Sequence, residues 1–173
     1  QPPTTNHRSP IASPKKQPFF QDVSELLGHT HADEPFDDFA RQPLLSRRLS
    51  QLGPGVAWHD VDQDGWDDLI IGTGRGGRLR VFRNNGRGRF SELLSPPIPE
   101  GVASDQTAIL GLTQRNGQTV LLVGSSNYED GLPAAIPVRQ YDFGRKIVDE
   151  SFPKLEGSIG PMALSDIDGD GDL

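Results

Sequence analysis

The chain has no cysteine, no long apolar run and no excess of positive charge, and each absence narrows its possible functions. Without cysteine, the 173 residues can form neither a disulfide framework nor a thiolate metal site. The absence of cysteine does not decide the cellular compartment. No stretch of about 18 apolar residues occurs, so no transmembrane helix is predicted. The formal net charge of -7 argues against binding to nucleic acid or to an anionic membrane.

Glycine and proline are frequent instead, since 20 Gly and 15 Pro indicate many turns and few long helices. Residues 1–18 combine prolines with mostly small and polar side chains, which bury too little surface to offset the cost of ordering, so we expect a flexible leader. Residues 19–54 carry apolar clusters, and we expect this segment to pack on the domain that follows. The chain begins at Gln1 without a recognisable signal sequence, so we expect a processed protein or a piece of a longer one.

The most informative stretch is the acidic segment DVDQDGWDD, which runs from Asp60 to Asp68 between two apolar flanks. Two unit charges about 4 Å apart repel by roughly 4 kcal/mol at an effective dielectric constant near 20, so a cation is needed to hold such carboxylates together. An all-oxygen ligand shell suits Ca²⁺. The predicted ligands are the carboxylates of Asp60, Asp62, Asp64 and Asp68 and the main-chain carbonyl of Trp66.

An EF-hand is the obvious alternative, because its loop begins with the same pattern. It requires a bidentate Glu at the twelfth position and a helix on each side, whereas the twelfth residue here is Ile71. The flanks GVAWH and LIIGT are short and bounded by glycine, which is typical of strands. The sequence therefore predicts a nine-residue calcium loop between two strands; a solvated acidic turn is less consistent with four aspartates at ligand spacing.

The sequence also repeats with a period of about 53 residues. After a shift of 52 residues, LIIG at 69–72 falls on LLVG at 121–124, and Gly65 falls on Gly117. A third copy opens at Pro161 with an apolar strand and a second acidic loop. Each copy has the order expected for a four-stranded antiparallel unit: strand, polar turn, strand ending in Gly, glycine-rich loop and two further strands.

Such a unit at this period is the signature of a propeller blade. We therefore predict an all-β fold, a fragment of a β-propeller, in which the repeat region 55–173 contains blades at about 55–95, 106–150 and 160–173. Because the third copy stops inside its own acidic loop, we expect the chain to belong to a larger propeller.

The pattern DxDxDGxxDL, followed by an apolar strand and GTG, resembles the FG-GAP or VCBS repeat of integrin α-subunit propellers and of many bacterial secreted proteins. The segments FQDVSELLGHTH, FDDFARQPLLSRRLSQLGPGVAW and SSNYEDG are also similar to the cartilage acidic protein group, ASPIC/UnbV. The resemblance covers about residues 19–173. It implies a propeller of about seven blades, Ca²⁺ sites and an extracellular or periplasmic protein, and it implies no reaction.

The predicted metal loops differ between the repeats. In the second repeat no carboxylate stands at a ligand position, so no Ca²⁺ site is predicted; the equivalent residues are Leu112, Gln114, Asn116, Gln118 and Val120. The third repeat supplies the carboxylates of Asp166, Asp168 and Asp170 and the main-chain carbonyl of Asp172.

Two further features each allow two interpretations. His29 and His31 would point the same way on a strand, but no third ligand is identifiable, so ordinary packing or surface histidines are favoured over a zinc or copper site. Residues 127–130, which include Tyr128, are read as a turn in preference to a contact for a partner or a sugar. No Ser-His-Asp set or unexplained carboxylate pair indicates an enzyme.

We therefore expect a calcium-stabilised propeller module that binds a protein or glycan partner and catalyses no reaction. The alternative is a carbohydrate-binding protein, or a hydrolase or lyase, whose active loops lie in further blades. A convergent set of carboxylates, histidines or aromatic residues on the face opposite the calcium loops would favour this alternative.

Overall fold

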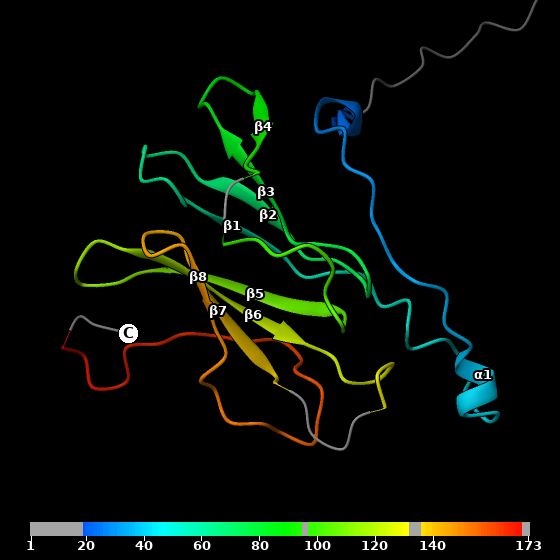
Figure 1. Cartoon of the computed structure of the whole chain (residues 1–173). Helices are drawn as coiled ribbons and strands as arrows, with labels where there is room; N and C mark the ends of the chain where they lie inside the picture. The colour runs from blue at the N-terminus through cyan, green and yellow to red at the C-terminus, as the bar shows by residue number, and fades with distance from the viewer. Residues whose placement is uncertain (1–18, 95–96, 132–135, 171–173) are drawn as a thin grey trace, which may run out of the picture.

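The computed structural model describes residues 19–94, 97–131 and 136–170. Within these ranges the chain forms two four-stranded antiparallel sheets, with strand orders β1-β2-β3-β4 and β5-β6-β7-β8 (Figure 1). The prediction of an all-β fold with four-stranded antiparallel blades is therefore confirmed. The predicted leader, residues 1–18, lies outside the described residues.

Each sheet is built from strands that follow one another directly in the sequence. The first contains β1 (Val56–His59), β2 (Asp68–Ile71), β3 (Arg80–Asn84) and β4 (Phe90–Glu92). The second contains β5 (Gln106–Thr113), β6 (Thr119–Ser125), β7 (Val138–Asp142) and β8 (Ile147–Asp149). Two short helices precede them, the 3-10 helix η1 (Ser24–Leu26) and the α-helix α1 (Asp38–Arg41).

The strand pairing shows that the two repeats are offset by 52 residues in one strand and by 53 in the other. His59 pairs with Asp68 in the first sheet, and Leu112 pairs with Val120 in the second. The turn of the second repeat is therefore one residue shorter. Thr113, not Leu112, stands at the position of Asp60, which corrects the sequence alignment and still leaves that turn without a carboxylate.

The core lies between the two sheets. Its buried members come from facing strands of both sheets and include Ile70, Val81, Ile109, Leu121 and Tyr141. Burying a large aliphatic or aromatic side chain contributes about 1.5–3 kcal/mol, so this interface holds the sheets together. The outer face of the first sheet exposes Val56 and Trp58, whereas Ile109, the counterpart of Val56, is covered by the first sheet.

A glycine stands at the end of the second strand in each of the two sheets, because the following segment approaches closely there. A Cβ atom on Gly72 would lie 2.9 Å from the main-chain oxygen of Gln106, and one on Gly124 would lie 2.5 Å from Ile159 Cγ2. The sequence LIIG and its counterpart LLVG thus combine a buried strand with a glycine that allows close contact with the segment that follows.

The third copy continues this contact but does not form the expected strand. Ile159 donates its main-chain N–H to the oxygen of Ser125 at 3.0 Å, and its own oxygen accepts from the Thr107 hydroxyl at 2.6 Å. The apolar segment that starts at Pro161 has no strand assignment. In the other copies this segment pairs with the strand after the acidic turn, and the described residues contain no such partner for it.

Candidate metal-binding sites

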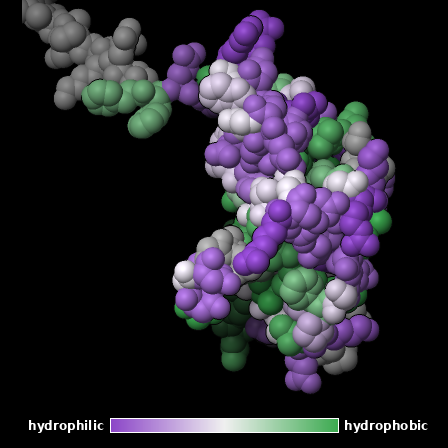
Figure 2. All heavy atoms as spheres, turned by 90° about the vertical axis from the view of Figure 1, so that its left-hand side faces the viewer, coloured by the Kyte–Doolittle hydropathy of each residue, from purple (hydrophilic) through white to green (hydrophobic). Residues whose placement is uncertain are grey.

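The first turn of each sheet and the acidic segment of the third copy lie on the same side of the molecule. In Figure 1 the β1–β2 turn, the β5–β6 turn and the segment 166–170 all point to the left. Figure 2 faces this side and shows mainly hydrophilic residues, with hydrophobic ones gathered in its lower half. The predicted calcium loops therefore share one polar side of the fold.

Three of the four aspartates predicted in the first loop converge. Asp60, Asp62 and Asp68 each place one carboxylate oxygen within 4.8 Å of the others. The chain turns back here through two residues with positive φ, Gln63 at 63° and Gly65 at 91°. Amide groups of the loop support the arrangement, because Asp60 accepts from the main-chain N–H of residue 64 at 3.1 Å and of Gly65 at 2.8 Å.

Asp68 is the buried anchor of this group. Its side chain is inaccessible, at 0% exposure, and each oxygen accepts a main-chain N–H, from Val61 at 3.0 Å and from Asn84 at 2.8 Å. Burial raises the pKa of this carboxyl, although both hydrogen bonds act in the opposite direction. Val120 takes the same place in the second sheet and belongs to its core, so Asp68 is a carboxylate at a core position.

The other two predicted ligands lie differently. Asp64 is outside the group of three, and its Oδ1 accepts the main-chain N–H of Trp66 at 2.9 Å, which closes a local turn. The Trp66 ring lies against Gly86 in the β3–β4 turn, where a Cβ atom would come within 2.3 Å of it. The indole thus packs the acidic loop against the β3–β4 hairpin.

The second repeat keeps the turn without the carboxylates. Asn116 Oδ1 accepts the main-chain N–H of Gln118 at 2.9 Å, and Gly117 has a φ of 80°. The side-chain amide of Gln63 donates to the main-chain oxygen of Gly117, so the two turns are also joined. This turn is one residue shorter than the first and lacks its charge.

The third repeat gathers its acidic residues again. Asp166, Asp168 and Asp170 offer oxygens within 4.8 Å of one another, and Asp166 accepts the main-chain N–H of Gly169 at 2.7 Å. Gly169 has a φ of 74°, matching Gln63 at the fourth position of the first loop. The remaining predicted ligand, Asp172, lies outside the described residues.

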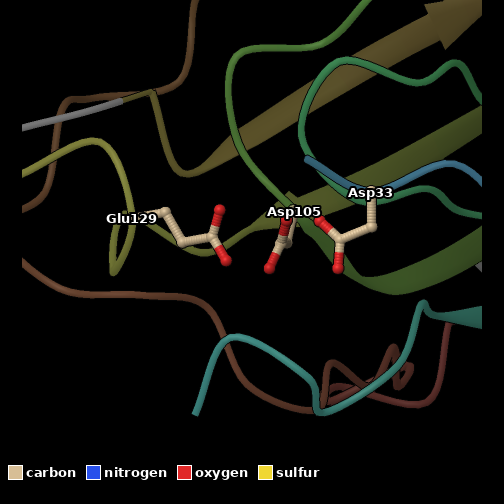
Figure 3. A group of neighbouring side chains, drawn as sticks. All are labelled: Asp33, Asp105 and Glu129. Carbon is tan, nitrogen blue, oxygen red and sulfur yellow. The ribbon is translucent and has the colours of Figure 1, made fainter. Parts of the chain in front are cut away.

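One further acidic group was not foreseen from the sequence. Asp33, Asp105 and Glu129 converge from three distant segments, with one oxygen of each within 4.8 Å of the others (Figure 3). Burial, followed by the nearby carboxylates Asp105 and Asp33, raises the pKa of Glu129 to about 7. None of the three stands in a motif, so no spacing rule could have found them. Neither His29 nor His31 belongs to these acidic groups.

Residues 60–111 match the family model of the FG-GAP-like repeat. The match begins at the first aspartate of the acidic loop and ends inside β5, so it covers the first blade and the start of the second. Searches of curated proteins and of solved structures gave no significant match. No helix within the described ranges has the length and hydropathy needed to cross a bilayer. The chain thus contains a stretch similar to the FG-GAP-like repeat within a fold of two four-stranded β-propeller-type blades.

Proposed function

We propose that this chain is a calcium-binding FG-GAP/VCBS-type propeller module of the ASPIC/UnbV group, located in the periplasm or outside the cell. It acts as a scaffold or interaction module for a protein or glycan partner and catalyses no reaction. The observation that best supports the proposal is the convergence of Asp60, Asp62 and Asp68 at the start of the FG-GAP-like match.

The charge balance of this loop supports a divalent cation. Three carboxylates face one guanidinium, since Arg83 forms an ion pair with Asp62. Together with the Asp64 carboxylate of the same loop, these groups carry a charge of -3, which one divalent cation lowers to -1. Carboxylate oxygens without nitrogen or sulfur donors favour Ca²⁺ over transition metals, and the Asp64 carboxylate and Trp66 carbonyl complete the proposed shell. Dissociation constants of about 0.1–1 mM suffice outside cells, where calcium is abundant.

Calorimetric titration with Ca²⁺ tests this function. We expect Asp60→Asn and Asp62→Asn each to remove one binding event, because each substitution takes a ligand charge from the loop. Asp67→Asn is the matched control, since it removes the same charge from an exposed residue of the same loop that lies outside the group. Unchanged Ca²⁺ binding in both Asp60 and Asp62 variants would reject the proposal.

A carbohydrate-binding protein, or a hydrolase or lyase, is the second candidate. The observation that favours it is the group Asp33, Asp105 and Glu129, which lies at the ends of the strands opposite the acidic turns: Asp105 precedes β5 and Glu129 follows β6. Binding and turnover assays on a panel of polysaccharides, with Glu129→Gln for comparison, separate the two candidates. Turnover that depends on Glu129 would favour the enzyme.

A further inference from the structure

The acidic group at the far end of the strands joins parts of the chain that are otherwise separate. Asp33 belongs to the segment before the first sheet, Asp105 immediately precedes β5, and Glu129 follows β6. In Figure 3 the three carboxylates point toward one another. Their convergence is a tertiary feature, unlike that of the aspartates of the turns, which are neighbours in sequence.

Glu129 is buried without a hydrogen-bond partner among the described residues. Its side chain is only 2% exposed, and neither Oε1 nor Oε2 accepts a hydrogen bond. The nearest cationic atom, Arg75 Nε, lies 3.9 Å from Oε2 and donates instead to Glu34 at 2.9 Å. Buried polar atoms are normally paired, and a buried charge is costly unless it is neutralised. Both oxygens of Glu129 are therefore left without a hydrogen-bond donor among the described residues, and Arg75 is their one cationic neighbour there.

The other two carboxylates lie beside the loop after β2. Asp105 uses Oδ1 to accept the main-chain N–H of Arg75 at 2.9 Å. Asp33 lies tightly against Gly74, where a Cβ atom would stand 2.5 Å from Asp33 Oδ1. A hollow of about 10 Å³, roughly the size of one water molecule, adjoins Asp33 and Asp105 but is not lined by Glu129.

Distances and charge both suit a single ion. Oxygen ligands lie about 2.3–2.6 Å from Ca²⁺, so two on opposite sides are about 4.6–5.2 Å apart. One oxygen of each of the three side chains lies within 4.8 Å of the others, so a single ion could contact all three. Because Arg75 is already paired with Glu34, the three carboxylates when ionised carry three negative charges, of which one divalent cation offsets two. From this we propose that Asp33, Asp105 and Glu129 bind a divalent cation of the calcium class, at a site separate from the acidic turns.

Such an ion would link the segment before β1 to the two sheets. Next to the group, the main-chain N–H of Gly74 donates to Ala32 at 3.0 Å, and that of Glu34 donates to Arg75 at 3.1 Å. These two bonds connect the N-terminal segment to the loop after β2, with Asp33 between them. Cation binding would therefore stabilise this junction. The hydrogen exchange of the Glu34 and Gly74 amides measures that stabilisation.

The experiment uses the intact chain in which the turns are first disabled by Asp62→Asn and Asp168→Asn. We expect this background variant to bind one Ca²⁺ by calorimetry, and the exchange of the Glu34 and Gly74 amides with solvent to slow when Ca²⁺ is added. Adding Glu129→Gln or Asp33→Asn should weaken this binding at least tenfold and abolish the slowing. Glu25→Gln, which removes an exposed carboxylate of the same segment, is the control and should change neither.

Arg75→Gln separates an ion site from a merely structural cluster. It removes the positive charge nearest Glu129, so Ca²⁺ should bind several-fold more tightly while the unliganded protein becomes less stable. Failure of the background variant to bind Ca²⁺, or binding that survives both Glu129→Gln and Asp33→Asn, overturns the proposal. Binding of Zn²⁺ alone, abolished by substitution of the nearby His31, overturns it as well. Because the turns are disabled, these results do not depend on the calcium sites proposed above.

Discussion

Asp64 and Asn116 occupy the same position in two successive turns, and each accepts the main-chain N–H two residues later at 2.9 Å. Only the turn of Asp64 is surrounded by further carboxylates. The pair therefore separates two tasks of the repeat. Closing the turn needs an Asx side chain, whereas the proposed binding of Ca²⁺ needs several negative charges.

We expect Asp64→Asn to preserve the fold and weaken Ca²⁺ binding. The amide oxygen of Asn can accept the Trp66 N–H as Asn116 does for Gln118, so the free energy of unfolding in chelator should change by less than about 0.5 kcal/mol. Asp64→Ala should lose the turn as well as the charge. Urea unfolding in chelator and Ca²⁺ titration measure the two effects separately. Equal destabilisation by Asn and Ala in chelator would contradict this division of tasks.

Asp68 should be needed for stability even without a cation. Its two oxygens pair the buried N–H of Val61 and the half-buried N–H of Asn84, and leaving a buried donor unpaired costs about 1–3 kcal/mol. Asp68→Ala should therefore lower the free energy of unfolding by at least about 2 kcal/mol in chelator, while Asp67→Ala, an exposed neighbour, should have little effect. A loss below about 0.5 kcal/mol for Asp68→Ala would show that these bonds contribute little.

Gly72 should not tolerate a methyl group. An added Cβ would lie 2.9 Å from the oxygen of Gln106, and such overpacking typically costs about 1–3 kcal/mol. Gly157→Ala is the control, because no atom lies within 4 Å of a Cβ there and its φ is not positive. Thermal unfolding of both variants measures the difference. Equal melting temperatures would mean that the contact between the repeats is looser than described.

Protonation of Asp38 in acid should reduce the stability of the N-terminal segment. Burial raises the pKa of this carboxyl, but hydrogen bonds from the Ser50 hydroxyl, the Ser50 amide and the Leu49 amide outweigh burial and lower the pKa from its ordinary value of 3.8 to about 2. A lowered pKa means that the stabilisation is complete above about pH 4 and is lost as the pH falls toward 2.

The stability difference between the native protein and Asp38→Asn should accordingly shrink between about pH 4 and pH 2. Denaturant unfolding at pH 7, 4 and 2 measures this difference. Ser50→Ala should reduce it at pH 7, since the Ser50 hydroxyl donates to Asp38 Oδ2 at 2.6 Å. A difference that is constant with pH would contradict the assignment of these bonds to the ionised carboxylate.

The sequence predicted the parts of the fold that depend on neighbouring residues. Alternating aspartates with Gly65 indicated a tight acidic turn, and the apolar segments ending in Gly72 and Gly124 indicated the second strand of each blade. It misplaced the second turn by one residue, because both Leu112 and Thr113 can end a strand and only pairing with the next strand decides between them.

The remainder depends on contacts between distant residues. Asp33, Asp105 and Glu129 lie in unrelated stretches, and only the packing of the N-terminal segment on the sheets brings them together. The place of Trp66 on Gly86 is a tertiary contact of the same kind. The sequence also did not indicate that Asp68 is buried, because its position in the acidic pattern suggests only a metal ligand. The hydrogen bonds that it accepts from Val61 and Asn84 show that it also supports the fold.

A crystal structure of the protein grown in millimolar Ca²⁺, with anomalous scattering recorded, tests the central claim most directly. We expect an anomalous peak about 2.3–2.6 Å from carboxylate oxygens of Asp60, Asp62 and Asp68, and no peak at the turn that contains Asn116. Full density for these side chains without a peak between them, and with the Arg83 guanidinium alone balancing their charge, would contradict the account.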